Sequence, residues 1–593
     1  MDPKANVNLD AKARQSMMML KNLDSQFARA NSMLQKQETA VRGSAKVNLA
    51  LRQSALAITR LDANSKMEDI EKQFEEANDA IKHLESTTVK ETKNVAEIQS
   101  EKEKINEINA STGSTAIAKK TPMVQFRPPP EIVKARKRSE PLGENSPYLP
   151  SDVCEGGFLP MTYIDLQYGE IATIDALWVF KEEISEDRLK EGLELLLTEL
   201  PSLAGRINSK RCGIDLTNDG VPFYLQEASG SWKDFPREIE PRNSYLDKPE
   251  ILDMFNGTAP VMTVVLTHMM DGGCVLGVTV SHMVAGGNGF FAYVMPRFAA
   301  FVRTCDPSAI TEKDLGFVKP IEDRRELPQA KRSLEQLQQL IDSLENPPLS
   351  FRDLLFGRMK RSVLYMLLRN SRDQNRVFVH FPPEELDAIK NEVLANSDKL
   401  KWISTANALA AHLTKVLASL APNSPATPTQ AGLIIDHVNK LKHLPKGLMA
   451  NTFYLYSCTF DKWINKSTTS EIAEQLHQTV QNVLADPQAL IDEMAFEEDC
   501  LKWNYQPNPR LKLSIPVIVN NQSKFKPLVQ LDFGTGVCEM YVPHKAGDSL
   551  LMVPATDRGI DVWLSTVNIF TGNPLYLKTE AFQREMHKYA KNS

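Results

Sequence analysis

The sequence is poor in the features that define several large classes of protein. Its seven cysteines are odd in number, are scattered from Cys154 to Cys538 and form no C-x-x-C pair. We therefore expect neither a disulfide framework nor a cysteine-based zinc site. No apolar run approaches the ~18 residues of a membrane-spanning helix, and the N-terminal residues lack the apolar core of a signal peptide. These absences predict a cytoplasmic protein without a membrane span.

A large excess of one charge is also missing. The 593 residues carry a formal net charge of −6, which gives no reason to expect a nucleic-acid partner. There is no H-E-x-x-H or H-x-x-x-H spacing, no P-loop and no dinucleotide-binding glycine motif, so we expect no metal site and no permanently bound cofactor. Hydrophobic residues make up 42% of the chain, enough for a large core divided among several domain-sized units.

The first 110 residues are predicted to be helical. Proline is absent between Pro3 and Pro122, and a set of apolar residues alternates steps of three and four, which is the seam of a coiled coil. These residues are Met67, Ile70, Phe74, Ala77, Ile81 and Leu84. Such a narrow stripe must be covered. It packs either on another helix, from a second copy or a partner protein, or on the rest of the same chain, and we favour the first alternative.

The remaining sequence predicts a linker followed by two similar lobes. Residues 111–152 are rich in proline and basic residues, as is typical of linkers. Beyond them strands and helices are mixed, which indicates an α/β fold. We place an N-terminal lobe at residues 153–330, a charged helical crossover at 331–375 and a C-terminal lobe at 376–593.

Two helices are particularly clear in this part of the chain. A helix over residues 186–199 would turn Leu189, Leu193, Leu196 and Leu197 inward. Another runs from residue 406 to 420, with Ser404 or Thr405 as its N-cap. Both helices are amphipathic or apolar enough to cover a sheet.

His282 is the strongest candidate for chemistry. The β-branched, apolar run at residues 274–280 predicts a buried strand that ends at this histidine, and the apolar spacing after Gly286 and Gly287 predicts a core helix. A histidine at the end of a core strand is held on rigid backbone while its ring can face a cavity. The glycines allow another segment or a ligand to approach closely. Taken alone, however, a single histidine is more often structural than catalytic.

Other signatures accompany His282 in a definite order along the chain. They are Leu200-Pro201-Ser202-Leu203-Ala204-Gly205-Arg206, His282-x-x-x-Gly286-Gly287, Ser404-Thr405-Ala406, Asn451, and Leu531-Asp532-Phe533-Gly534-Thr535-Gly536. This series resembles the BAHD-type acyl-CoA-dependent acyltransferases of plants and fungi, including the fungal trichothecene acetyltransferases. Their hallmarks are an H-x-x-x-D motif and a D-F-G-W-G motif. The resemblance spans about residues 155 to 585.

The resemblance implies both a fold and a reaction. The fold would consist of two lobes like that of chloramphenicol acetyltransferase, with a channel between them. Acyl-CoA would be the co-substrate and a small-molecule alcohol or amine the acceptor, in a reaction of secondary metabolism. His282 would act as general base, with direct attack on the thioester and no acyl-enzyme. Thr405 or Thr535 could contact the oxyanion or the substrate, whereas Gly286, Gly287, Asp532, Phe533, Gly534 and Gly536 would shape the structure around them.

The sequence departs from the family pattern at two positions. Gly286 stands where the family has its motif aspartate, and Thr535 stands where it has tryptophan. The arginine that pairs with this aspartate in the family is also missing from the matching segment, Asp436-His437-Val438. Losing one partner of a buried pair costs ~3–5 kcal/mol, so we expect that the pair was lost as a unit. An alternative therefore stays open, in which the chain is a catalytically silent acyltransferase fold that acts as a binding module through its coiled coil.

Overall fold

The structure, a computed structural model, describes most of the chain after residue 123. The described residues are 124–136, 157–237 except 172, 244–344, 376–420, 430–505 except 439, 440, 442 and 504, 517–543, 550–565 and 579–590. The chain divides into two units, and every described residue belongs to the larger one, Lys119–Phe351 with Leu367–Ser593. The predicted coiled coil over residues 1–110 lies outside the described residues, so its existence and its partner stay predictions.

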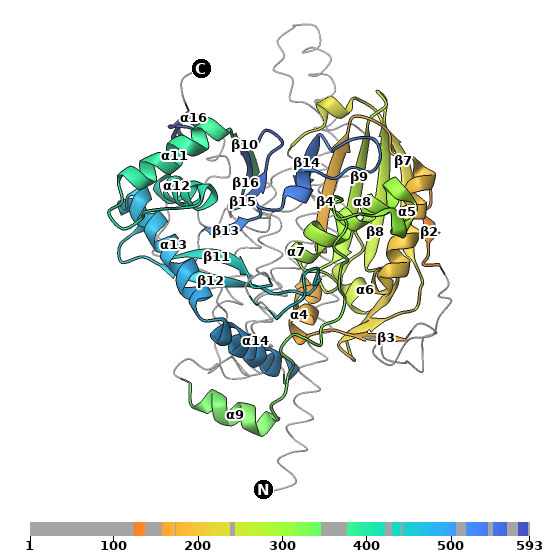
Figure 1. Ribbon diagram of the computed structural model, residues 1–593, viewed down its shortest axis with the longest axis horizontal. Helices are drawn as coiled ribbons and strands as arrows, with labels where there is room; N and C mark the ends of the chain where they lie inside the picture. Colours follow the sequence, from red (N-terminus) through yellow and green to blue (C-terminus); the bar gives the residue numbers. More distant parts are fainter. Residues whose placement is uncertain are drawn as a thin grey trace, which may run out of the picture. The chain divides into compact units, whose positions relative to one another are not determined.

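A seven-stranded mixed sheet forms the first of the two lobes (Figure 1). Its strands are β1 (Val124–Phe126), β2 (Glu131–Val133), β4 (Thr173–Phe180), β7 (Val221–Ala228), β8 (Met262–Met269), β9 (Cys274–Ser281) and β14 (Met540–Pro543). They follow the order β1-β7-β8-β9-β4-β14, and β2 also pairs with β7. The β7–β8 pair is parallel and the other pairs are antiparallel.

Two of these strands lie inside the segment that we predicted to be a linker. β1 and β2 flank three consecutive prolines and both pair with β7. Proline cannot donate to a ladder and is confined to the edges and ends of strands, which fits its place between two short edge strands. The guanidinium of Arg127 fastens this segment by donating to Gln226 Oε1 at 2.9 Å. With three residues each, the strands are too short to show a periodicity in the sequence.

Two helices cover one face of this sheet: the leucine-rich helix predicted at residues 186–199 and the core helix predicted after Gly287. α5 (Glu186–Glu199) has the predicted bounds, and the four leucines expected to point inward are fully buried. It packs on α8 (Met295–Thr304), which continues a helical turn at α7 (Gly287–Gly289) and a π-helical turn at Phe290–Val294. Burying one leucine stabilises a fold by ~1.5–3 kcal/mol, so this layer contributes strongly to the first core.

The opposite face of the first sheet is covered by a loop rather than a helix. Phe235, Tyr245 and Leu246 are buried there against Leu177 and Val275. The loop approaches so closely that a β-carbon at Gly277, in the middle of β9, would lie 2.1 Å from the Tyr245 carbonyl oxygen. Both faces are therefore buried, which explains why β4, β8 and β9 are almost continuously apolar.

The second lobe contains a six-stranded mixed sheet. Its order is β10-β16-β15-β13-β11-β12, with parallel pairing of β11 with β13 and of β13 with β15. The strands are β10 (Arg376–Phe381), β11 (Gln430–Asp436), β12 (Phe453–Thr459), β13 (Ile518–Asn521), β15 (Leu550–Pro554) and β16 (Ile560–Ser565). The helices are α11 (Pro383–Ala395), α12 (Thr405–Leu420), α13 (Thr469–Ala485), α14 (Pro487–Lys502) and α16 (Glu580–Met586). Ser404 caps α12 by accepting from the backbone N–H of Asn407 at 3.1 Å, as predicted.

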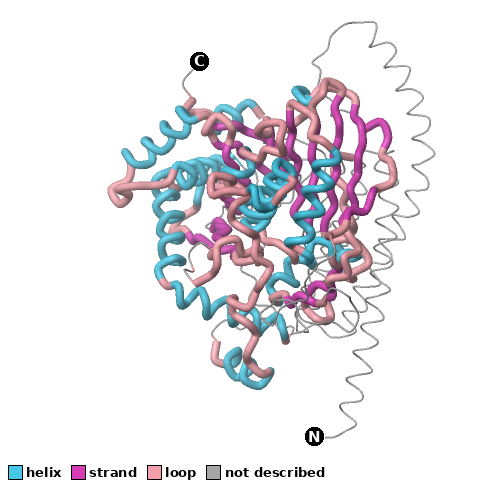
Figure 2. Tube along the Cα trace, turned by 45° about the vertical axis from the view of Figure 1, so that its right-hand side comes forward, coloured by secondary structure: helices cyan, strands magenta, loops and turns pink. Residues whose placement is uncertain are grey.

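Smaller elements, all except α9, are interspersed in the sequence among the strands of the first sheet. A three-stranded sheet has the order β3-β6-β5. Its strands are β3 (Phe158–Pro160), β5 (Arg206–Asn208) and β6 (Gly213–Asp215), and the neighbouring short elements are α4 (Tyr163–Ile171), α6 (Ile251–Phe255) and α9 (Leu334–Asp342). Residues 318–333 form turns and irregular backbone before α9. Figure 2 shows the long strands of the first sheet running side by side in the upper right.

Each lobe is bound by a segment from the other half of the chain. β14 comes late in the sequence but pairs with β4, so the C-terminal part of the chain completes the first sheet. In the other direction, Glu498 on α14 accepts from the backbone N–H groups of Tyr163 and Ile164 at 2.9 and 2.8 Å, at the start of α4. A carboxylate at a helix N-terminus is favourable because it satisfies unpaired N–H groups there.

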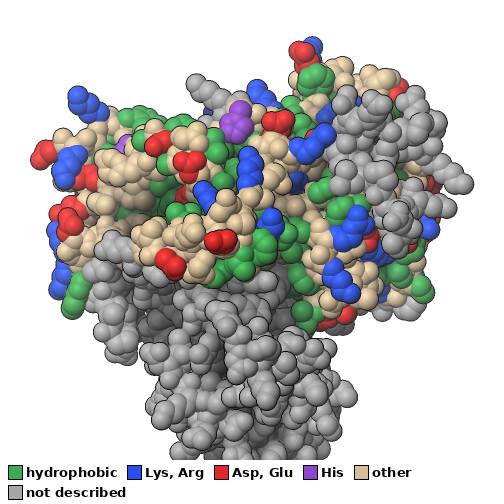
Figure 3. Space-filling view, turned by 90° about the horizontal axis from the view of Figure 1, so that it is seen from below, with side chains coloured by type: hydrophobic (Ala, Val, Ile, Leu, Met, Phe, Trp, Pro, Cys, Tyr) green, Lys and Arg blue, Asp and Glu red, His purple; other side chains and the backbone are tan. Residues whose placement is uncertain are grey.

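No helix among the described residues is both long enough and apolar enough to cross a membrane. On the face drawn in Figure 3, basic and acidic side chains are interspersed with hydrophobic ones.

Candidate active site

His282 stands at the position that the sequence predicts. It directly follows β9, and the turn after it leads into the helical segment that begins at Gly287. Strands β4 and β8 pair with β9 on either side along its length. The backbone that carries this histidine is therefore rigid, and the side chain emerges where the strand ends.

The imidazole of His282 lies among aromatic rings and is mostly withdrawn from solvent. The ring centroids of Tyr168 and Phe453 are 5.4 and 5.5 Å away, and the Tyr168 hydroxyl donates to the Phe453 carbonyl at 3.3 Å. Burial lowers the pKa of His282, and this effect outweighs the hydrogen bond to Asn451 and the nearby carboxylates, which raise it. The ring is thus a neutral imidazole near pH 7, able to accept a proton.

Asn451 connects the two lobes at this ring. It lies two residues before β12, and its Oδ1 lies 2.8 Å from His282 Nδ1. Its Nδ2 is 2.7 Å from both Asp165 Oδ1 and the carbonyl oxygen of His282, and its backbone N–H donates to the same Asp165 oxygen at 2.9 Å. The buried amide is therefore fully hydrogen-bonded, and His282 Nε2 makes no hydrogen bond to any described residue.

The carboxylate that binds Asn451 belongs to a buried ion pair. Arg324 Nε is 3.2 Å from Asp165 Oδ2, and the two side chains are 3% and 0% exposed. The same guanidinium donates to the carbonyl oxygens of Val284 at 2.8 Å and Glu322 at 2.6 Å. Val284 is two residues beyond the histidine, so Arg324 fastens the loop that carries His282 to the carboxylate that orients Asn451.

The Pro-Ser-Leu-Ala-Gly-Arg segment joins this arrangement through a neighbour of Arg324. Ser202 donates to Glu322 Oε1 through both its backbone N–H, at 3.2 Å, and its hydroxyl. Residues 320–327 gave no recognisable motif in the sequence. They are nonetheless the segment through which the motif at 200–206 and the His282 loop are linked.

Gly286, at the position of the family's motif aspartate, lies against the backbone of the second lobe. Its N–H donates to the Met449 carbonyl at 2.6 Å, and a β-carbon at residue 286 would lie 2.7 Å from the Ala450 carbonyl oxygen. In the segment where the family has the arginine, Val438 is buried in an apolar cluster. The contact between loop and lobe is thus made by backbone, without a side chain at position 286.

The Asp532 motif packs on the first lobe. Asp532 Oδ1 accepts from the backbone N–H groups of Gly534 and Gly536 at 2.7 and 3.1 Å, and both glycines have a positive φ. The ring of Phe533 stands edge-on to those of Phe180 and Phe298. The motif forms a tight turn that is anchored in the core beside β4 and α8.

The sequence predicted that Thr405 and Thr535 could contact the oxyanion or the substrate. Neither threonine belongs to the elements that carry His282 and the residues in contact with its ring. Thr405 begins α12 and Thr535 lies inside the Asp532 turn. The structure finds Asn451, Tyr168 and Phe453 in contact with the His282 ring. A catalytic role for either threonine stays a prediction.

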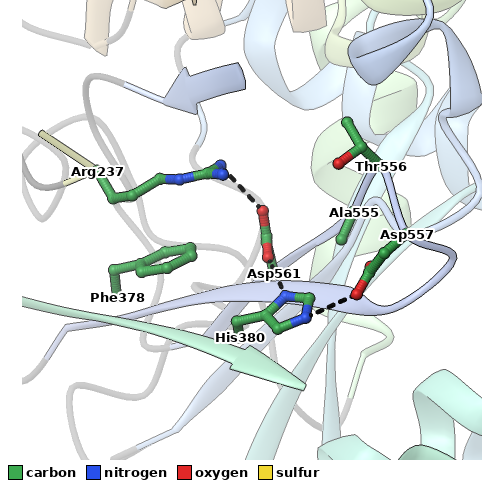
Figure 4. A pocket seen from close by; sticks show the side chains of 7 residues that line it. All are labelled: Arg237, Phe378, His380, Ala555, Thr556, Asp557 and Asp561. Atoms are coloured by element: carbon green, nitrogen blue, oxygen red, sulfur yellow. Dashed lines mark hydrogen bonds and ion pairs between the residues drawn. The ribbon is translucent and has the colours of Figure 1, made fainter. Parts of the chain in front are cut away.

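A separate polar pocket of about 260 Å³ lies where Arg237 meets the second sheet (Figure 4). Asp561 is placed between Arg237, at 3.2 Å, and His380 Nδ1, at 2.7 Å, while His380 Nε2 is 3.0 Å from Asp557. Phe378 lies under the guanidinium. Asp561 thus joins Arg237 of the first half of the chain to His380 of the second sheet, which makes this pocket a second contact between the two halves of the chain.

Two lobes with mixed sheets and a strand-end histidine where they meet define the two-lobed acyltransferase fold. A family model described as "Transferase family" matches residues 149–568. The chain therefore belongs to this family, the BAHD-type acyl-CoA acyltransferases, as its motifs predicted. A search of curated proteins with the sequence finds no match.

Solved structures of similar fold include members of the same class. Vinorine synthase is 15% identical, with a TM-score of 0.51 over 75% of this chain and 96% of that chain. TRI101 of F. sporotrichioides, complexed with coenzyme A and T-2, is 15% identical with a TM-score of 0.53 over 72% and 98%. TRI101 of F. graminearum, complexed with coenzyme A and T-2 mycotoxin, is 17% identical with a TM-score of 0.52 over the same shares. The two-lobed fold predicted from the sequence is confirmed.

We expect the buried Arg324 to matter far more for folding than the adjacent Arg325. Arg324→Met would leave the Asp165 carboxylate buried without its partner and should lower the free energy of unfolding by ~3–5 kcal/mol. Urea denaturation of both variants would measure the difference. Arg325→Met is the matched control, because Arg325 is 60% exposed and pairs with Asp323 at the surface; we expect no measurable change of the midpoint. Equal midpoints for the two variants would contradict this role of the buried pair.

Restoring the family's aspartate should damage this chain. Gly286→Ala and Gly286→Asp both place a β-carbon against the backbone at Ala450, so we expect overpacking of ~1–3 kcal/mol and a lower thermal midpoint. Gly287→Ala is the control, since no atom lies within 4 Å of a β-carbon there. A gain in stability from Gly286→Asp would mean that the loop can accept the family's geometry.

Proposed function

We propose that this protein transfers an acyl group from acyl-CoA to a hydroxyl or amine of a small-molecule acceptor. The observation that carries the proposal is the state of His282. Its ring is neutral, its Nδ1 is engaged by Asn451, and its Nε2 makes no hydrogen bond to the described residues. Family membership supplies the reaction class, and coenzyme A bound to TRI101 supports the donor.

In the proposed reaction, the hydroxyl oxygen or amine nitrogen of the acceptor attacks the thioester carbonyl. As it does so, Nε2 of His282 takes the proton from that atom. The tetrahedral intermediate then collapses, the carbon–sulfur bond breaks, and the imidazolium returns its proton to the thiolate of CoA. The thioester is already activated, so no acyl-enzyme is required. General-base catalysis contributes ~10²–10⁴-fold, and holding both substrates in line contributes up to ~7–11 kcal/mol.

The alternative of a silent acyltransferase fold rests on the missing motif aspartate. What supports the enzyme over this alternative is that His282 keeps a rigid, hydrogen-bonded setting without that residue. Arg324 fastens the loop at Val284, and Gly286 is hydrogen-bonded directly to Met449. The proposal therefore does not depend on an aspartate at position 286.

We expect His282→Ala to reduce release of free CoA at least ~10²-fold, because the general base is removed. The wild type would be incubated with acetyl-CoA and longer acyl-CoAs in the presence of pools of small alcohols and amines, with detection of the free thiol. His268→Ala is the matched control, since His268 also lies near the end of a strand, β8, and is partly exposed; it should keep wild-type activity. If the wild type releases no CoA with any donor and acceptor pool, the silent alternative stands.

The pH dependence should report the same histidine. As a base, His282 works only when neutral, so kcat/KM should fall on the acid side at the pKa of the free enzyme. Because burial lowers this pKa below the ordinary value of 6.5, we expect the acid limb to have its midpoint below pH 6.5 and the rate to be flat near pH 7. Initial rates at fixed ionic strength would show this. A midpoint above 6.5 would contradict a buried, neutral base.

A further inference from the structure

The amide of Asn451 can adopt only one orientation. Its Nδ2 lies 2.7 Å from a carboxylate oxygen of Asp165 and 2.7 Å from the backbone carbonyl oxygen of His282. Both of these oxygens accept hydrogen bonds, so the atom facing them must be the NH₂ group. The amide oxygen is thereby turned toward His282 Nδ1, at 2.8 Å.

This orientation decides which nitrogen of the imidazole carries the proton. An amide oxygen only accepts hydrogen bonds, so the Nδ1 of neutral His282 must be the donor. Nε2 then holds the lone pair. The tautomer is set by a residue of the second lobe, 169 positions further along the chain.

We propose that Asn451 is a positioning residue that locks His282 in the Nδ1–H tautomer, and that the buried Asp165–Arg324 pair holds Asn451 in place. This inference rests on the proposed function, in which Nε2 is the base. It identifies which atom of the histidine reacts and which residues prepare it. Asn451 and Asp165 act through the ring and touch no reacting atom.

The choice of an amide over a carboxylate at position 451 has an electrostatic consequence. A carboxylate against Nδ1 would favour the imidazolium, whereas the neutral amide orients the ring without adding a charge. The carboxylates whose charges act on the pKa of His282, raising it, are Asp165 on α4 and Asp175 on β4. Each has a cation beside it, Arg324 at 3.2 Å and Lys248 at 2.6 Å. The titratable side chain of Tyr168 also lies near the imidazole, with its ring tilted against it.

Nitrogen NMR of protein labelled with ¹⁵N-histidine tests the tautomer in the free, full-length chain. The resonances of His282 would be assigned by their loss in His282→Ala. We expect a protonated Nδ1 and an unprotonated Nε2 above the titration midpoint. A protonated Nε2 would overturn the proposal. This measurement needs neither a substrate nor a variant at position 451, so it stands even if such variants fold poorly.

Two variants then separate positioning from mere structural support. Asn451→Asp should raise the NMR titration midpoint of His282 above the wild-type value, and the acid limb of kcat/KM should move up with it. Asn451→Ala should lower kcat by ~10–10²-fold with little change in KM, because the ring is misplaced while substrate contacts remain. Asn396→Asp, at the exposed C-terminal end of α11, is the control for added charge and should shift neither midpoint.

The outcomes also distinguish this inference from the proposed function. An inactive wild type with a protonated Nδ1, and with an upward shift in Asn451→Asp, would remove the acyltransferase activity and leave the positioning intact. An active wild type whose His282 midpoint is the same in Asn451→Asp would keep the activity and overturn the role of Asn451.

Discussion

The buried ion pair between Asp165 and Arg324 is the contact on which the candidate site depends. Neither side chain is more than 3% exposed, so neither charge would be tolerated alone. Arg324 also binds the carbonyl of Val284 and Asp165 also binds Asn451. These partners come from both lobes, because Asn451 belongs to the C-terminal lobe and the others to the N-terminal lobe. The full network, with Asn451 bound to Asp165, can therefore form only when the two lobes have folded onto each other.

Stability alone does not explain why charges occupy this position. Well-packed apolar residues of the same volume can replace a buried pair without loss of stability, and often with a gain. An apolar replacement, however, could not accept from the backbone and side chain of Asn451 or donate to the His282 loop. The pair provides fixed geometry: one carboxylate oxygen orients the amide, the other meets the guanidinium, and the guanidinium grips the loop.

The local structure around His282 was predictable because it is encoded in adjacent residues. The apolar run before the histidine indicated a buried strand. For the same reason, the leucine spacing at 186–199 predicted a helix elsewhere in the first lobe with the observed bounds and the observed buried face. The supporting residues gave no such signal. Asp165 and Arg324 are 159 positions apart, and Asp165 and Asn451 are 286 apart, so no periodicity connects them.

Other misses have the same physical origin. Arg324 and Arg325 are adjacent and chemically identical, and only tertiary packing makes one buried and the other exposed. β1, β2 and β14 are three or four residues long and gain their identity from the strands that they pair with. Asn451 stood in the series of family signatures, but an asparagine before a strand carries no mark of its partner. Tertiary contacts determine whether such short segments become strands and which distant polar residues pair, so neither can be predicted from neighbouring residues.

The missing motif aspartate takes on a different meaning in this setting. In the family that residue points away from the substrate, and its partner is an arginine of the second lobe. Here a backbone hydrogen bond from Gly286 to Met449 joins the same two parts, and the gap is too narrow for a side chain. Aspartate at position 286 would need both space and a cation, and Val438 supplies neither. A glycine in the motif is therefore what this loop requires to dock, and its presence does not indicate that the histidine has lost its support.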